Sequence, residues 1–201
     1  MSASHTQAPN APAPTARSPF DWMHASAQPR LLALLTGVTL ALSVWLSVLG
    51  AALTTEVTPQ GIVSFELAGT AAAAQAVIGA WDARAREAAM LVQGVDFLFL
   101  VAYPLWFSLA SLRLGRRLGG VWQRAGQRLA WAVLLAAPLD VIENLALIRQ
   151  LEFGASDAAA RIAWASAVPK FALVAVATVF VASASALALV DWLRGRSTSP
   201  G

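Results

Sequence analysis

Three carboxylates and the chain's only lysine lie inside apolar runs that are each long enough to cross a bilayer. These residues are Asp96, Asp140, Glu143 and Lys170. An ionisable side chain at membrane depth is costly, normally faces the interior of a helix bundle, and often marks a functional site. Carboxylates there can hold a divalent cation, act as an acid and a base, or receive the positive group of a ligand. These four residues therefore define the first candidate site.

The charged residues of three runs share one predicted depth. Each lies about nine residues, or ~14 Å of helical rise, from a charge at the outer end of its run. The pairs are Asp96 with Glu87, Asp140 with Arg149, and Lys170 with Arg161. Three helices therefore present ionisable groups in the outer half of a hydrocarbon core ~30 Å thick.

Spacing also predicts which side chains face one another. Asp140, Glu143 and Asn144 follow i, i+3, i+4 spacing and share one helical face. Asp96 and Tyr103 share a face of the preceding run, with Tyr103 about two turns deeper. We therefore expect a polar contact between these helices, and Tyr103 at the floor of any pocket there.

The charges of this cluster do not balance. Three potential anions face Lys170, which we interpret as the partner of Asp140 or Asp96 rather than as a nucleophile. Either some carboxyls are protonated, or water, a cation or a positive ligand group enters. Glu66, in the segment after the first run, is a further acid that could fold in and change the balance. A cluster that only fixes helix packing is the alternative.

Apolar helices must position these residues. The 201-residue chain is 58% hydrophobic and 12% charged, with a mean hydropathy of +0.62, which is typical of an integral membrane protein. Four runs approach the ~20 residues needed to cross the hydrocarbon core, at about 31–53, 90–112, 129–148 and 165–190. The sequence predicts an all-α, four-helix membrane bundle over residues 30–193.

The remaining segments are predicted to lie outside the bilayer. Residues 1–29 and 194–201 are expected to be cytoplasmic tails, the first of them disordered because it is rich in Ala, Pro, Ser and Thr. Residues 54–69 suit an extended loop or a short strand. Thr70 is a plausible N-cap for one amphipathic helix through residue 89, which would lie at the outer surface and carry Trp81 over the pocket.

Arginine placement predicts the orientation. Short cytoplasmic segments carry excess Lys and Arg, and the basic residues gather in both tails and between the second and third runs, at Arg17, Arg30, Arg113, Arg116, Arg117, Arg124, Arg128, Arg194 and Arg196. Both termini are therefore predicted to be cytoplasmic. Because these arginines flank apolar runs, the high pI does not indicate nucleic-acid binding.

The composition limits the possible cofactors. The chain has no Cys, and its two histidines, His5 and His24, lie in the polar tail. We therefore expect no haem, iron–sulfur cluster or thiolate zinc site. A divalent cation is left open, with Asp96, Asp140 and Glu143 as its ligands.

Two segments resemble those of a group of small bacterial four-span membrane proteins without an assigned activity. They are "VSFELAGT" at 63–70 and "LDVIEN" at 139–144, together with Trp81 and Asp96. The resemblance covers roughly residues 60–190. It implies a bacterial inner-membrane location and a shared pattern that includes Glu66, Asp96, Asp140, Glu143 and Asn144, and it supplies no reaction.

The leading hypothesis is a multi-pass membrane protein with an outward-facing intramembrane pocket that binds a small molecule or a lipid head group. The pocket would be lined by Glu66, Asp96, Tyr103, Asp140, Glu143, Asn144 and Lys170. One alternative is a membrane enzyme that uses a carboxylate-bound cation or an acid–base pair on a lipid-linked substrate. A scaffold or accessory subunit is another, and a protein partner or homo-oligomer is left open.

Overall fold

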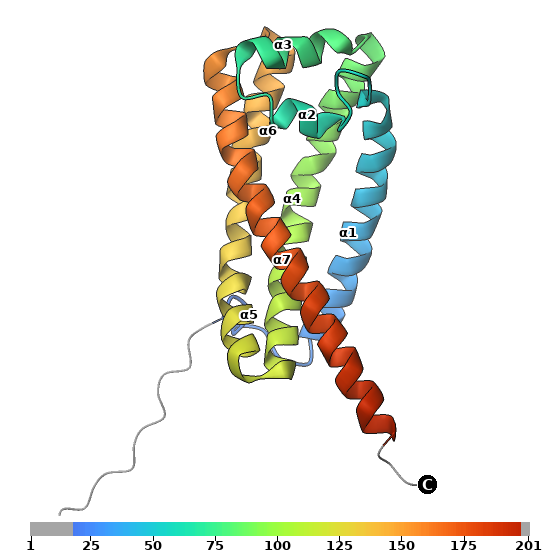
Figure 1. Cartoon of the computed structure of the whole chain (residues 1–201), viewed down its shortest axis with the longest axis vertical. Helices are drawn as coiled ribbons and strands as arrows, with labels where there is room; N and C mark the ends of the chain where they lie inside the picture. The colour runs from blue at the N-terminus through green and yellow to red at the C-terminus, as the bar shows by residue number, and fades with distance from the viewer. Residues whose placement is uncertain (1–17, 198–201) are drawn as a thin grey trace, which may run out of the picture.

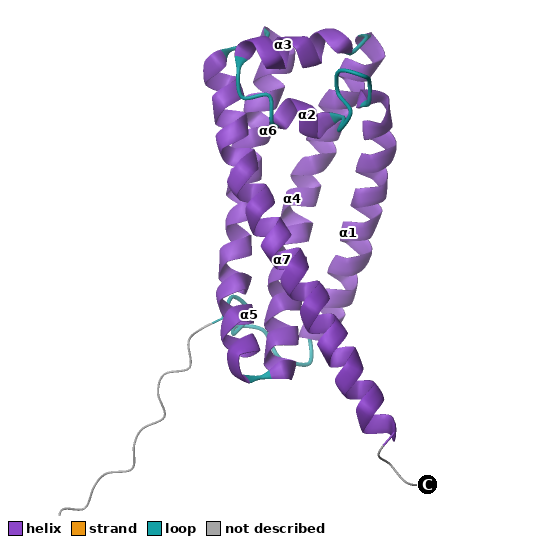
Figure 2. Cartoon of the chain, viewed as in Figure 1, coloured by secondary structure: helices purple, strands orange, loops and turns teal. Residues whose placement is uncertain are grey.

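The computed structural model describes residues 18–197, and every regular element in that range is a helix (Figures 1 and 2). The elements are α1 (Gln28–Gly50), the short 3₁₀ helix η1 (Ala51–Leu53), α2 (Ile62–Glu66), α3 (Ala71–Ala80), α4 (Ala83–Leu118), α5 (Gly120–Ala132), the 3₁₀ helix η2 (Val133–Leu135), α6 (Ala136–Phe153) and α7 (Asp157–Ser197). The predicted all-α class is confirmed.

Four of the described helical segments are long and apolar enough to cross a membrane, as predicted. They are Gln28–Leu53, Ala83–Leu118, Gly120–Phe153 and Asp157–Arg194. Each is longer than the apolar run that predicted it, because polar and charged residues continue the helix beyond that run. The third consists of α5, η2 and α6 placed end to end.

α4 is the central helix of the bundle. α1, α5, α6 and α7 all pack against it, and α6 also packs along α7. The packing partner of α1 is α4 rather than α7, and α7 crosses in front of α4 in Figure 1. The lower ends of α1 and α7 lie at the same end of the molecule as the α4–α5 turn (Figure 1). The basic segments therefore gather at one end, which we call the arginine-rich end.

α2 and α3 cover the opposite end of the bundle (Figure 1). The Trp81 ring packs edge-on against Phe65 with centroids 5.6 Å apart, and its indole Nε1 donates a 2.9 Å hydrogen bond to the carbonyl of Leu53. Trp81 is 1% exposed. These contacts anchor the cover to the end of the first span.

Two predictions for this region were wrong. Residues 62–66 form the helix α2 and no strand, because a single turn buries Phe65 and Glu66 together against the bundle. The helix predicted from Thr70 to residue 89 is broken at Trp81, and the Asp82 carboxylate caps a new helix by accepting a 2.7 Å hydrogen bond from the Ala85 amide. The Thr70 N-cap is confirmed by a 3.2 Å hydrogen bond from the Ala73 amide.

The α4–α5 turn depends on glycine. Gly119 and Gly120 have φ values of +71° and +53°, which favour residues without a side chain. Just beyond the turn, Gly115 and Gly126 bring the backbones of the two helices into contact. A small-residue contact of this kind is common between membrane helices.

The boundaries of the predicted tails need correction. Phe20 is 4% exposed and packs against Leu35 and Leu109, and Asp21 pairs with Arg116 at 3.2 Å. Residues 18–29 are therefore ordered against the bundle, because an aromatic side chain in this stretch finds an apolar site between α1 and α4. Residues 1–17 of the predicted tail lie outside the described residues, as do residues 198–201 of the C-terminal one, whereas α7 continues to Ser197.

Candidate functional site

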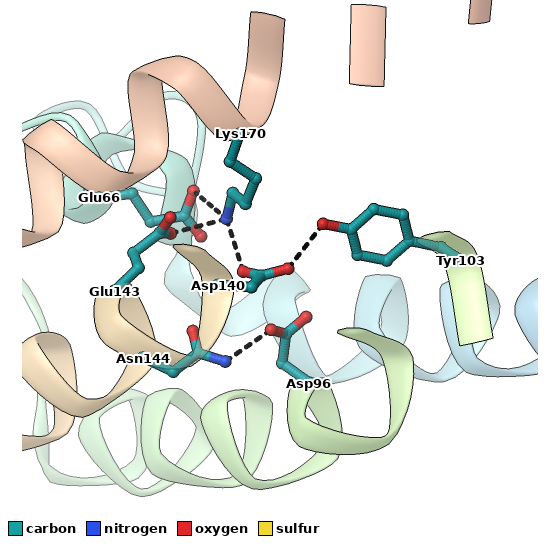
Figure 3. Close-up of polar contacts among 7 residues, drawn as sticks. All are labelled: Glu66, Asp96, Tyr103, Asp140, Glu143, Asn144 and Lys170. Atoms are coloured by element: carbon teal, nitrogen blue, oxygen red, sulfur yellow. Dashed lines mark hydrogen bonds and ion pairs between the residues drawn. The ribbon is translucent and has the colours of Figure 1, made fainter. Parts of the chain in front are cut away.

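Lys170 of α7 lies at the centre of a buried polar cluster (Figure 3). Its ammonium nitrogen, Nζ, is 2.8 Å from Asp140 Oδ1, 2.8 Å from Glu143 Oε1 and 3.9 Å from Glu66 Oε2. Two of these acids come from α6, and Glu66 comes from α2. The Lys170 ammonium on α7 therefore joins α7 to α2 and α6.

Two hydrogen bonds extend the cluster to α4. The Tyr103 hydroxyl donates to Asp140 Oδ2 at 2.9 Å, and the Asn144 amide nitrogen donates to Asp96 Oδ2 at 2.7 Å (Figure 3). All seven side chains that the sequence indicated thus lie together. Lys170 pairs with Asp140, one of the two partners predicted for it, whereas Asp96 binds Asn144 instead.

Local sequence explains why these side chains meet. Asp140, Glu143 and Asn144 occupy one face of α6 and are at most 2% exposed. Asp96 and Tyr103 are about two turns apart on α4, so they meet the two ends of that polar face. Lys170 is 7% exposed and reaches α6 from α7. The i, i+3, i+4 spacing on α6 is therefore the framework of the cluster.

The cluster contains four carboxyl groups and one ammonium group. When all are ionised, the Oε2 atoms of Glu66 and Glu143 are buried without a hydrogen-bond donor among the described residues. The two side chains are within hydrogen-bonding reach of each other, so one proton on either carboxyl would supply the missing donor. α2 lies outside the four spans, and there burial raises the pKa of Glu66, with the Lys170 ammonium opposing the rise and Asp140 adding to it.

The acids are not arranged as a metal site. Within the described residues no group of three His, Cys, Asp or Glu side chains is placed to hold an ion. The Lys170 ammonium occupies the space between Asp140 and Glu143, and Asp96 faces Asn144. The set Asp96, Asp140 and Glu143, considered above as metal ligands, is therefore divided between two different partners.

A cavity of about 360 Å³ adjoins the cluster. Its wall is almost entirely apolar and comes from α1, α4 and α7, formed by Thr36, Thr39, Leu40, Ser43, Phe99, Tyr103, Trp106, Phe107, Lys170, Phe171 and Val174. The cavity is partly open. Lys170 and Tyr103 belong to both the cluster and the cavity wall.

Sequence reasoning missed the contribution of α1. Thr36 Oγ1 accepts a 2.8 Å hydrogen bond from the Trp106 indole, and Thr39 Oγ1 is buried with no hydrogen-bond partner among the described residues. With Ser43, these hydroxyls recur along one face of a span that has no charge after its first turn. That spacing is the signal that could have found them.

Gln93 on α4 was also missed. It is 1% exposed, and neither its side-chain oxygen nor its nitrogen has a hydrogen-bond partner in the described part of the chain. It precedes Asp96 by nearly one turn, so its amide faces the same side of α4. A polar residue inside an apolar run was again the available signal.

The geometry places the accessible space differently from the sequence-based expectation. α2, with Glu66, closes the cluster from the covered end, whereas the cavity is on the side of the cluster formed by α1, α4 and α7. α2 therefore occupies the predicted outward-facing opening, and the cavity lies between α1, α4 and α7 instead.

The chain matches no family model, and no curated protein or solved structure shows significant similarity to it. The resemblance to small bacterial four-span proteins stays a prediction.

Proposed function

We propose that this multi-pass membrane protein binds an amphipathic small molecule or lipid whose apolar part occupies the cavity between α1, α4 and α7. The observation that supports this most directly is the shared position of Lys170 and Tyr103, which border both the cavity and the polar cluster. A ligand of roughly drug or lipid-chain size fits a pocket of several hundred Å³ with a mostly apolar wall.

In this proposal the polar cluster acts chiefly as the support of the cavity. Lys170 and its carboxylates join α2, α6 and α7, and the Tyr103 bond to Asp140 joins α4 to them. These buried ionic contacts fix the register of the helices against one another, so the wall of the cavity keeps its shape. A head group bound directly by the cluster is less favoured, since α2 covers it and few polar atoms reach the cavity surface.

The proposed location follows the arginine distribution. The arginine-rich end would face the cytoplasm, with both termini on that side. Together with the resemblance described above, the arginine distribution supports a bacterial inner-membrane location. A reporter fusion at the C-terminus that is active only in the cytoplasm tests this orientation.

Native mass spectrometry of the detergent-purified protein tests ligand binding. Thr39→Trp fills the cavity, whereas Val38→Trp, its neighbour on the outer face of α1, adds the same side chain at a position that is 39% exposed. We expect a co-purified ligand on the wild type and on Val38→Trp, and none on Thr39→Trp. A wild-type protein without any ligand, or a Thr39→Trp variant that keeps it, would contradict the proposal.

A further inference from the structure

The cavity beside Lys170 continues toward the arginine-rich end. A second cavity of about 320 Å³ shares Thr36 and Trp106 with it, and a third of about 370 Å³ shares Arg117 and Ser185 with the second. Each lies along α7, and the first two are also bordered by α1 and α4. The three cavities therefore form one groove, which we call the α1–α7 groove.

Two arginines border this groove near its end. Arg113 and Arg117 are one turn apart on the same face of α4. The half-buried Arg113 guanidinium has no hydrogen-bond or ion-pair partner within the described residues. Arg117 donates a long 3.4 Å hydrogen bond to the carbonyl of Ala188. None of the residues that line the second and third cavities is acidic, so the groove has positive charge without a protein counter-charge.

The neighbouring Arg116 is different. It points to another face of α4 and pairs with Asp21 at 3.2 Å. Among the described residues, Arg116 thus has a carboxylate partner and the two groove arginines have none. A guanidinium fork matches a phosphate group in two parallel hydrogen bonds, which is the chemistry that such a site favours.

The groove also has the length of a lipid chain in one leaflet. Arg113 and Tyr103 are separated by roughly 15 Å of helical rise, which is half the ~30 Å hydrocarbon core. Trp192 lines the third cavity beside Arg117, where an interfacial aromatic residue is expected. Basic pockets between membrane helices on the cytoplasmic side are known to hold anionic lipid head groups.

We propose that the α1–α7 groove binds one anionic phospholipid, with its phosphate on Arg113 and Arg117 and an acyl chain that passes Trp106 into the cavity beside Lys170. The occupant is a lipid rather than free phosphate, because the groove beside the arginines continues into a cavity with an almost entirely apolar wall. The position of the acyl chain rests on the proposed function, whereas the position of the phosphate depends only on the two arginines.

Native mass spectrometry after exchange into mixed micelles that contain equal amounts of phosphatidylglycerol and phosphatidylcholine tests this inference. The wild type should retain phosphatidylglycerol in preference to phosphatidylcholine. Arg113→Gln with Arg117→Gln should lower that preference roughly tenfold or more. Arg116→Gln with Arg124→Gln removes the same charge from surfaces outside the groove and should leave the preference unchanged. Excess inorganic phosphate should not displace the lipid.

The outcomes separate the two proposals. Equal retention of both lipids by the wild type, or a preference that survives loss of both groove arginines, would overturn the lipid assignment. If Thr39→Trp still expels a co-purified ligand in that case, the cavity proposal stands without the phosphate site. A preference lost equally in both double variants would also overturn it, because net charge alone would explain the binding.

Discussion

Asp140 on α6 and Lys170 on α7 form a 2.8 Å ion pair inside a bundle of four helices that are apolar enough to cross a membrane. Lys170 also donates a hydrogen bond to Glu143, and Asp140 also accepts one from the Tyr103 hydroxyl. The pair therefore connects α4, α6 and α7. Breaking a buried pair costs more than removing both partners, because a single partner leaves an uncompensated charge.

Lys170→Met should therefore be the most destabilising substitution in the cluster. It leaves Asp140, Glu143 and Glu66 without their common cation, and we expect a loss of about 3–5 kcal/mol in the free energy of unfolding. The combination with Asp140→Asn should lose clearly less than the sum of the two single variants, since the charge imbalance is reduced. Denaturant titration in detergent measures the free energy of unfolding of the wild type, the two single variants and the double variant. Strictly additive losses would show that Lys170 and Asp140 are not coupled.

Tyr103→Phe should have a smaller effect. It removes the hydroxyl that donates to Asp140 and keeps the ring contact with Phe99, whose centroid is 5.0 Å away. A loss of about 1–2 kcal/mol is expected, because the acceptor belongs to an ion pair. Thr36→Val, which removes the neutral bond from Trp106, serves as the comparison and should cost about 0.6 kcal/mol. Equal losses would mean that the Asp140 bond has no special strength.

The sequence predicted the four spans and the polar face of α6 because both depend on local periodicity. Asp140, Glu143 and Asn144 had to point in one direction once residues 136–153 formed a helix. The common depth of Asp96 and Lys170 followed from helical rise. These are properties of single helices, which the residue spacing determines.

The sequence could not decide between the possible partners within the cluster, because that choice depends on how the helices rotate against one another. The choice of Asp140 over Asp96 by Lys170 is a tertiary property, as is the entry of Glu66 from α2. The break at Trp81 was missed for a related reason. The indole reaches the Leu53 carbonyl only when the chain turns there, and the helical pattern of residues 70–89 gives no sign of that contact.

Gly126→Ala should disrupt the close contact between α4 and α5. A methyl group there would collide with the backbone carbonyl of Ser111, and at Gly115 it would lie 2.6 Å from the carbonyl of Trp122. We expect a loss of about 1–3 kcal/mol for Gly126→Ala from overpacking. Gly94→Ala, where an added methyl group would meet no neighbouring side chain or other helix within 4 Å, should be neutral or slightly stabilising. Thermal unfolding of both variants decides this, and equal stability would contradict the close helix contact.

Stability should fall as the pH rises through the titration of Glu66. Burial raises the pKa of its carboxyl above 4.5, so the folded state retains a proton that the unfolded chain releases. The loss of folding stability therefore starts near pH 4.5, grows as the pH rises and levels off above the raised pKa. Glu66→Gln, which stays neutral, should show a flatter dependence of melting temperature on pH. A steeper dependence of melting temperature on pH in this variant would contradict a raised pKa for Glu66.

Removal of divalent ions should leave the protein unchanged. The ammonium of Lys170 already occupies the space between Asp140 and Glu143, so we expect the same melting temperature with EDTA and with added Mg²⁺ or Ca²⁺. Lys170→Met supplies the informative comparison, because it frees those carboxylates for a hard cation. A wild-type protein that melts at a higher temperature with either ion would support the metal-dependent enzyme instead.

The cavity between α1, α4 and α7 can be tested most directly by photo-crosslinking with a diazirine-bearing phosphatidylglycerol, followed by peptide mapping. The probe should label residues 36–43, 99–107 and 171–174, and unlabelled phosphatidylglycerol should suppress the label there. Labelling confined to the exposed outer faces of α1 and α7, such as Val44 and Val176, and unaffected by competitor, would contradict ligand binding in the cavity.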